Sequence, residues 1–261
     1  MPYLLSEGVR LHYESSGPAH APWLLLLNSL GTELSLWDAQ LPTLERAFRV
    51  LRYDARGHGH SQSSSGPRAE YSLEQLGRDA LALLDRLEIA SAHVCGISLG
   101  GLTAQWLAVH AAERVQRLVL SNTAARIGGA ERWQERIDSV RTHGLAPLVQ
   151  PSLERWFTAS YRAREQPRVE AFGRRLLATD PVAYAGCCAA LRDADLRAEL
   201  VRIVAETLVI SGSDDLATTP QEARALASAI PAAQLLELPA AHLANVEAAD
   251  AFTTALSDFL R

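Results

Sequence analysis

The sequence predicts an α/β protein in which a mostly parallel central sheet is flanked by helices and carries an inserted helical cap. Two observations predict this class. Short apolar runs alternate with helical patterns along the first half of the chain, as they do in proteins with parallel sheets. The alternation stops after Asn122 and resumes near residue 207. We therefore expect a core made of residues 1–125 and 197–261, and a cap made of residues 126–196.

The elements of the first half follow from apolar spacing. Alternating apolar and polar residues predict an edge strand, continuous apolar runs predict buried strands, and apolar residues three or four apart predict helices. Ser72 is suited to cap the second helix, because its hydroxyl can accept a bond from a free backbone N–H of the first turn. The expected strands are Val9–Glu14, Trp23–Asn28, Val50–Tyr53, Ala92–Gly96 and Val115–Ser121, and the expected helices are Leu34–Phe48, Leu73–Ile89 and Leu99–Ala112.

The second half begins with the expected cap. No strand pattern occurs between Arg126 and Leu196, where glycines and prolines separate several amphipathic helical stretches. The strand and helix patterns then return, so that this part of the chain extends the same sheet. The expected elements are a strand at Thr207–Ser211, a helix near Gln221–Ile230, a strand at Gln234–Leu238 and a final helix from Asn245.

Composition excludes several classes of protein. The net charge of −5 argues against a nucleic-acid partner, which requires a basic surface. The longest apolar run, Trp23–Leu27, is too short to span a membrane, and the first residues lack the basic and apolar regions of a signal peptide. Three cysteines without metal-binding spacing are typical of reduced thiols in the cytoplasm. We expect a cytoplasmic protein with no metal and no cofactor, and a homo-oligomer is an open alternative.

A candidate nucleophile follows one of the predicted buried strands. The residues there are Gly96-Ile97-Ser98-Leu99-Gly100, and a helical pattern begins immediately after the serine. A sharp turn between a strand and a helix needs small flanking residues, and it lifts the serine hydroxyl clear of the sheet. The position also places this hydroxyl at the positive end of the helix dipole. The alternative is an ordinary glycine-rich turn, but the strand and helix on either side favour Ser98 as a nucleophile.

An acid and a base follow two later strands. Asp214 and Asp215 come directly after the strand that ends at Ser211, and His242 follows the strand that ends at Leu238. Since the carboxyl ends of parallel strands meet at one edge of a sheet, a carboxylate and an imidazole at these places can reach each other. His242 would accept the proton of the nucleophile, and the carboxylate would hold the ring and stabilise its charged form. Either aspartate could fill the acid role.

Residues 53–61, Tyr-Asp-Ala-Arg-Gly-His-Gly-His-Ser, resemble a loop shared by α/β-hydrolases, and the resemblance to this family extends over nearly the whole chain. The loop is structural in that family, so its two histidines are not catalytic candidates. The order serine, aspartate, histidine is also that of the family. Its spacing places the acid three residues after a glycine, which favours Asp215 over Asp214. The resemblance thus implies a triad of Ser98, Asp215 and His242.

The family resemblance also implies an oxyanion hole. Its members usually carry His-Gly after the strand that is expected here at Trp23–Asn28, whereas this chain has Asn28-Ser29-Leu30-Gly31. The backbone N–H groups remain available despite this departure. By position, those of Leu30 and Leu99 would bind the oxyanion, and each such donor is worth about 3 kcal/mol or more in the transition state.

A narrower resemblance is to 3-oxoadipate enol-lactonases. It rests on residues 28–32 with 36–38, on residues 184–196 and on residues 212–220. This resemblance implies that a small anionic lactone is opened by water through an acyl-enzyme intermediate, as one step in the bacterial breakdown of aromatic compounds.

The expected cap is relatively basic, which suits an anionic substrate. Residues 126–196 hold 11 arginines against 9 acidic residues, which gives them a net charge of +2. Because the whole chain has a net charge of −5, the remaining residues carry −7. We expect Arg132, Trp133 and Arg136 to contact the substrate. Trp37, just after the expected oxyanion loop, either lines the pocket or belongs to the core.

Several alternatives stay open from sequence alone. A general carboxylesterase, a perhydrolase or a C–C hydrolase of the same fold would use the same triad. Epoxide hydrolases and haloalkane dehalogenases are disfavoured, because their nucleophile at this turn is aspartate rather than Ser98. A non-catalytic ligand receptor on this fold would typically lack a member of the triad, and all three residues are present.

Overall fold

A single sheet organises the molecule. The computed structural model describes residues 2–63, 66 and 69–261, and in this part of the chain eight strands occur in the order β1-β2-β4-β3-β5-β6-β7-β8. β2 is antiparallel to both of its neighbours, and the remaining pairs are parallel, which confirms the predicted fold class. The strands are β1 (Tyr3–Ser6), β2 (Val9–Ser16), β3 (Trp23–Leu27), β4 (Arg49–Tyr53), β5 (Ala92–Ile97), β6 (Val115–Ser121), β7 (Glu206–Gly212) and β8 (Gln234–Leu238).

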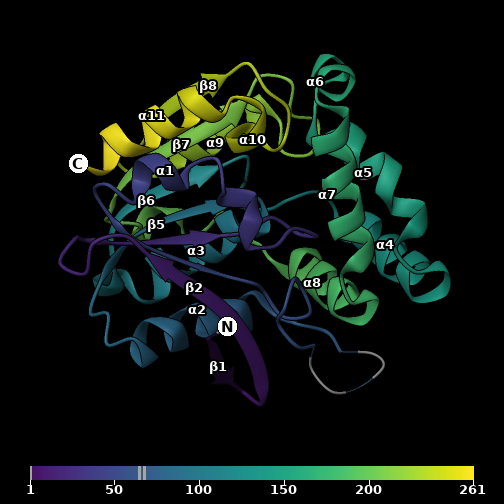
Figure 1. The fold of residues 1–261 in the computed structure, drawn as a ribbon, viewed down its shortest axis with the longest axis horizontal. Helices are drawn as coiled ribbons and strands as arrows, with labels where there is room; N and C mark the ends of the chain where they lie inside the picture. Colours follow the sequence, from purple (N-terminus) through teal and green to yellow (C-terminus); the bar gives the residue numbers. More distant parts are fainter. Residues whose placement is uncertain (1, 64–65, 67–68) are drawn as a thin grey trace.

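Helices cover both faces of the sheet. α2 and α3 lie on one face, while α1 and α11 lie on the opposite face (Figure 1). α2 begins as expected with Ser72, whose hydroxyl accepts a hydrogen bond from the backbone N–H of Gln75. The helices outside the segment between β6 and β7 are α1 (Leu41–Leu44), α2 (Leu73–Arg86), α3 (Leu99–His110), α9 (Pro220–Ala229), α10 (Ala244–Glu247) and α11 (Ala249–Leu260). The 3₁₀ turns outside residues 126–196 are η1 (Leu34–Trp37), η2 (Ala112–Arg114) and η4 (Leu200–Arg202).

The chain between β6 and β7 is helical, and we call residues 126–196 the inserted segment. Its helices lie together at one side of the sheet, coloured teal to green in Figure 1. Glycine and proline mark its helix ends: Gly144 ends one helix with a positive φ of 69°, and Pro181 begins another after the cap residue Asp180. The helices are α4 (Ala130–His143), α5 (Val149–Trp156), α6 (Ala159–Arg164), α7 (Gln166–Ala178) and α8 (Pro181–Asp193), with the 3₁₀ turn η3 (Ala146–Leu148).

Strand register brings distant loops to one edge of the sheet. The parallel strands β3, β5, β6, β7 and β8 all end at similar heights, so the loops that follow them are neighbours. The paired residues near these ends are Leu27 with Gly96, Ile97 with Ser121, Ser121 with Ile210, and Gly212 with Leu238. The chain order reverses between β3 and β5, and such a switch point is where open α/β sheets place their ligands.

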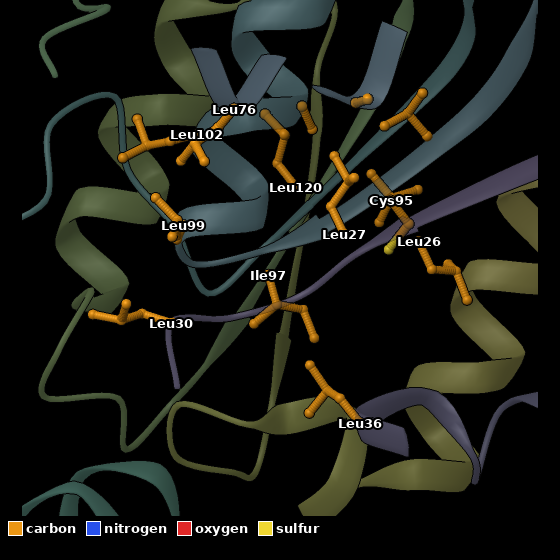
Figure 2. Packing of buried hydrophobic residues seen from close by; sticks show 14 of the residues in the cluster. Leu26, Leu27, Leu30, Leu36, Leu76, Cys95, Ile97, Leu99, Leu102 and Leu120 are labelled. Atoms are coloured by element: carbon orange, nitrogen blue, oxygen red, sulfur yellow. The ribbon is translucent and has the colours of Figure 1, made fainter. Parts of the chain in front are cut away.

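The hydrophobic core fills the space on both sides of the parallel strands. Leu27, Cys95 and Leu120 come from three adjacent strands and belong to the same buried cluster (Figure 2). Leu30 and Leu99, which follow β3 and β5, also belong to it. The two residues that are expected to form the oxyanion hole are therefore anchored by their own side chains.

Three elements differ from the sequence-based expectation. The final helix expected from Asn245 is divided into α10 and α11, with Ala248 between them. β1 was not predicted, because only four residues pair and the hairpin turn is formed by Glu7 and Gly8, both with positive φ. The single helix expected at Leu34–Phe48 was wrong. It is divided into η1 and α1, with Pro42 in the first turn of α1, where its missing N–H costs nothing.

In the part of the chain that the structure describes, no helix is both long enough and apolar enough to cross a membrane.

Candidate active site

Ser98 occupies a strained turn between β5 and α3. Its backbone has φ 57° and ψ −116°, a conformation that L-residues rarely adopt outside functional sites. The flanking glycines are required by close backbone contacts. A Cβ at residue 96 would lie 2.2 Å from the carbonyl oxygen of Gly100, and one at residue 100 would lie 2.3 Å from that of Leu27. The turn therefore has the geometry expected of a nucleophile elbow.

Asp215 and His242 lie in contact beyond the ends of β7 and β8. The Nδ1 atom of His242 is 2.8 Å from Oδ2 of Asp215, and both side chains are buried. Asp214 is exposed instead, and its carboxylate accepts a hydrogen bond from the hydroxyl of Ser213. Of the two aspartates that the sequence offers, only Asp215 is placed to orient the imidazole.

The Asp215 carboxylate is held in its charged form. Burial by itself raises the pKa of this carboxyl, but the charge of His242 and hydrogen bonds from His242, Asn122 and Thr218 outweigh it and lower the pKa to about 2. Asn122 donates to Oδ2 at 3.0 Å, and Thr218 donates to the same oxygen at 2.8 Å. Oδ1 accepts the backbone N–H groups of residues 217 and 218. Asn122 was not predicted from sequence, because nothing in its local pattern indicates the contact.

The contact with Asp215 fixes the histidine ring. Since a carboxylate only accepts, Nδ1 of His242 carries the proton, which leaves Nε2 as the basic nitrogen. His242 and Ser98 line the same pocket at the carboxyl edge of the sheet. The imidazole is therefore oriented by the acid on one side and presented to the pocket on the other.

The backbone N–H groups of Leu30 and Leu99 have no partner within the part of the chain that the structure describes. Leu99 is the first residue of α3, where N–H groups point out of the helix, and Leu30 lies in the loop after β3 and lines the same pocket as Ser98. Two unused donors beside a nucleophile are suited to bind a developing oxyanion.

Residues of the inserted segment form the opposite wall of this pocket. Helices α4, α5 and α8 all contribute side chains to it. The lining residues are Ser29, Leu30, Ser98, Ile127, Gly128, Arg132, Trp133, Arg136, Ser152, Arg155, Trp156, Tyr184, Leu191, Ala217 and His242.

Three arginines of this wall are Arg132, Arg136 and Arg155. Among the ion pairs formed by the described residues, none involves any of the three. Burial, together with the positive charges of Arg136 and Arg132, lowers the pKa of Arg155 to about 10. Such a cluster of like charges is costly without a ligand, and it is suited to bind an anion.

The two predicted tryptophans have different positions. Trp133 lines the pocket, and its indole N–H donates to the carbonyl oxygen of Ile127 at 2.6 Å. Trp37 is fully buried and does not line the pocket, so of the two positions that the sequence left open for it, the core is the one found, and it is not a substrate contact. Its indole N–H donates to the side-chain oxygen of Asn28 at 2.8 Å, and the ring packs near Phe252. Trp37 thus supports the loop after β3 from the core.

Comparison with known proteins agrees with this fold. The family model described as the alpha/beta hydrolase fold matches residues 22–249. The chain belongs to the α/β-hydrolase fold family.

Within the α/β-hydrolase fold family, the chain is similar to proteins that act on lactones and esters. It is 42% identical to 3-oxoadipate enol-lactonase 2 of Acinetobacter baylyi, over 99% of this chain and 96% of that protein. The crystal structure of the enol-lactonase from Burkholderia xenovorans LB400 superposes with a TM-score of 0.96, at 49% identity and with 99% of each chain covered. A thermophilic esterase from Thermogutta terrifontis superposes with a TM-score of 0.92 at 26% identity, over 100% of this chain and 97% of that chain.

Sequence reasoning missed one residue of the arginine cluster. Arg155 was not predicted, although Arg132 and Arg136 were. The signal was its position on α5, one helical turn after the buried Ser152 and next to the buried Trp156. Arg155 is partly buried and forms no ion pair among the described residues, and an arginine in such a setting indicates an anion-binding site.

Proposed function

We propose that this protein hydrolyses 3-oxoadipate enol-lactone to 3-oxoadipate, with Ser98 as nucleophile, His242 as base and Asp215 as the acid partner. The observation that carries this proposal is the set of three arginines without acidic partners on the wall of the pocket that Ser98 and His242 share. The substrate has a lactone carbonyl to be attacked and a free carboxylate to be bound. The similarity to enol-lactonases supports the same reaction.

In the first step, Ser98 attacks the lactone carbonyl while His242 takes the hydroxyl proton at Nε2. The carbonyl oxygen becomes an oxyanion, which the N–H groups of Leu30 and Leu99 stabilise. Asp215 stays ionised throughout and stabilises the imidazolium. The C–O bond of the ring then breaks, and the leaving oxygen is an enolate. Because an enolate is a better leaving group than a simple alkoxide, it needs less help from the proton on His242. His242 gives this proton to the departing oxygen, so the freed group is an enol and the imidazole is neutral again.

In the second step, water releases the acyl group. The leaving group stays tethered after ring opening, so it could close the ring again. We infer that ketonisation of the freed enol removes this returning nucleophile and draws the reaction forward. His242 then takes a proton from water, the hydroxide attacks the acyl-enzyme, and the proton returns to Ser98 as 3-oxoadipate leaves.

The inserted segment acts as a cap that binds the carboxylate. Arg132, Arg136 and Arg155 come from two helices, α4 and α5, and their charges converge on the pocket. A bound carboxylate would relieve their mutual repulsion, and a charge-assisted hydrogen bond contributes about 1.5–3 kcal/mol. This is why a charged lactone is favoured over a neutral ester of the same size.

The test is a comparison of two substrates on the purified protein. The enol-lactone should be turned over with a kcat/KM at least 100-fold above that of p-nitrophenyl acetate, and Ser98→Ala should abolish both activities. Robust ester turnover without lactone turnover would overturn the lactone assignment and leave the triad standing. That result would favour a carboxylesterase, which the similarity to an esterase makes the main alternative.

A second measurement separates an enzyme from a non-catalytic receptor of the same fold. A fluorophosphonate reacts with a serine that an adjacent base activates. We expect stoichiometric labelling of Ser98, with loss of labelling in His242→Ala. An unlabelled Ser98 in the folded protein would contradict the catalytic role.

A further inference from the structure

His58 contacts the loop that carries the proposed oxyanion donor Leu30. The ring nitrogen Nε2 of His58 accepts a hydrogen bond from the backbone N–H of Gly31 at 3.0 Å, and the other nitrogen, Nδ1, lies 2.9 Å from the carbonyl oxygen of Arg56. The side chain is buried, with 1% of its surface exposed. His58 does not line the pocket and does not belong to the proposed triad.

The two partners determine the protonation state of this ring. A carbonyl oxygen can only accept, so Nδ1 of His58 must carry a proton. A backbone N–H can only donate, so Nε2 must be unprotonated. Burial is the largest influence on this group and lowers the pKa of His58, and the nearby carboxylates of Asp54 and Asp180 oppose it. The neutral ring protonated on Nδ1 satisfies both contacts. In the imidazolium, Nε2 would also carry a proton, and its N–H would face the backbone N–H of Gly31.

The contact fixes one of the two peptide planes that meet at the Cα atom of Leu30. The plane between Leu30 and Gly31 is held by His58. The plane between Ser29 and Leu30 is held by Thr32, whose N–H and hydroxyl both donate to the carbonyl oxygen of Ser29, at 3.2 and 2.8 Å. In a trans peptide the N–H points opposite to the C=O. The N–H of Leu30 therefore points away from Thr32. The neighbouring plane, which His58 holds, limits how far the backbone can rotate about the Cα of Leu30 and so keeps this N–H in place.

We propose that His58 is a positioning residue that aims the N–H of Leu30 at the oxyanion by accepting the N–H of Gly31. This proposal rests on the oxyanion hole of the proposed function. Without His58, the loop is held by its own internal turn and by contacts further along the chain, such as the hydrogen bond from the N–H of Leu34 to Asp54. A donor that is misaligned loses much of its value in the transition state, while ground-state binding is little affected.

The loop after β3 needs the hydrogen bond from Gly31 to His58 because Gly31 itself is conformationally free. Gly31 has φ of +78°, and a Cβ there would lie 2.6 Å from Leu176 of the inserted segment. Position 31 is therefore restricted to glycine, and glycine has the largest freedom of backbone rotation. A hydrogen bond from a buried, rigid ring restricts that freedom at the residue next to the oxyanion donor.

The test compares three variants with p-nitrophenyl acetate as substrate. His58→Leu removes the acceptor, and His58→Gln offers a carbonyl oxygen in its place. His60→Gln is the matched control, because His60 lies two residues after His58, in the same stretch of residues 53–61, but is exposed. In His58→Leu, kcat should fall about 10- to 100-fold, below the roughly 100- to 1,000-fold loss of a whole donor, while KM stays within twofold. His58→Gln should recover most of kcat, and His60→Gln should equal the parent protein.

A boronic acid, which forms a tetrahedral adduct with the nucleophilic serine, adds a readout that depends on the oxyanion hole. Its inhibition constant should rise in His58→Leu by the same factor as kcat falls. An unchanged kcat in His58→Leu would overturn the proposal. So would a His58→Gln variant as slow as His58→Leu, since the ring would then serve packing alone.

Nitrogen NMR of the unmodified protein decides the question if His58→Leu does not fold. We expect one histidine ring, assigned to His58 by its absence in His58→Gln, to be neutral and protonated on Nδ1 at the pH of activity. A ring protonated on Nε2, or on both nitrogens, would overturn the proposal. The ester assay also separates this proposal from the proposed function. A parent protein that hydrolyses the ester but not the lactone would reject the lactone assignment and still allow His58 to be tested.

Discussion

Arginines occur in two opposite settings in this molecule. Arg52 and Arg56 are buried in the core region, and each binds two carboxylates: Arg52 those of Asp38 and Glu14, and Arg56 those of Asp79 and Glu7. The arginines of the pocket wall, Arg132, Arg136 and Arg155, form no ion pair among the described residues. The first group is paired with carboxylates of the fold, and the second lines the pocket without an ion pair.

This difference separates residues that stabilise the fold from residues that bind a ligand. A buried ion pair with both partners present costs little more than apolar packing, but breaking it leaves an uncompensated charge. An unpaired cluster at a pocket is already uncompensated, so removing one member should relieve repulsion. The same kind of substitution should therefore reduce stability in the core and reduce substrate binding in the pocket wall.

The largest expected effect is on stability, in Arg56→Met. Arg56 donates to both oxygens of the buried Asp79, at 2.6 and 2.7 Å, and the loss of this partner should cost about 3–5 kcal/mol. The measurement is the free energy of unfolding in urea. Arg155→Met is the matched control, and we expect its stability to equal or exceed that of the parent. Equal losses in the two variants would remove the distinction between the two settings.

The next effect concerns the buried acid of the proposed triad. Because the folded state lowers the pKa of Asp215 from 3.8 to about 2, its ionised form stabilises the fold above pH 5, and this contribution is lost as the pH falls through 3.8 towards 2. The free energy at stake is about 2–3 kcal/mol. The stability advantage of the parent over Asp215→Asn should shrink by this amount between pH 5 and pH 2. The exposed neighbour provides the control, since Asp214→Asn should show no such change. A constant difference across this range would mean that Asp215 is not held ionised.

The third effect is on substrate choice, in Arg155→Met. Loss of one charge-assisted contact should lower kcat/KM for the enol-lactone about 10- to 100-fold, mainly through KM, and should change p-nitrophenyl acetate hydrolysis less than twofold. Arg132→Met and Arg136→Met should act in the same direction. Arg174→Met is the control, because Arg174 lies in the same segment but is exposed and pairs with Glu170. Equal effects on both substrates would remove Arg155 from the proposed carboxylate site.

The pocket also shows how far local sequence patterns extend. Ser98, Asp215 and His242 follow strands, and their types and order suffice to place them at one edge of a parallel sheet. The contact between Asp215 and His242, and the placement of Ser98 and His242 at one pocket, depend on strand register, which apolar patterning fixes well in buried strands. Arg155 and Tyr184 reach the same pocket from helices α5 and α8, and their places depend on how the helices of the inserted segment pack. No short sequence motif determines how those helices pack, so the sequence did not place these two residues at the pocket.

Sequence patterns also failed to predict short elements whose ends are set by contacts with distant residues. The stretch from Leu34 to Phe48 has helical spacing, but Asp54 accepts the N–H of Leu34, and Arg52 donates to its carbonyl oxygen. These bonds begin a 3₁₀ turn at that point, and a second, short helix follows it. Both partners come from β4 or the loop after it, so only the folded chain brings them together. Local propensity was overridden by tertiary contacts.

The smallest expected effect tests the unpaired cluster directly, through stabilisation of Ser98→Ala by an anion. Adipate carries two carboxylates and no reactive ring, and by binding only the folded state it should add about 1.4 kcal/mol to the unfolding free energy at ten times its Kd. Dimethyl adipate, which is neutral and of similar length, should add less than a third of this at the same concentration. The gain should disappear when Arg155→Met is combined with Ser98→Ala, with ionic strength matched by sodium chloride. If adipate stabilised that double variant equally, its carboxylates would be bound elsewhere, and the unpaired arginines would need another explanation.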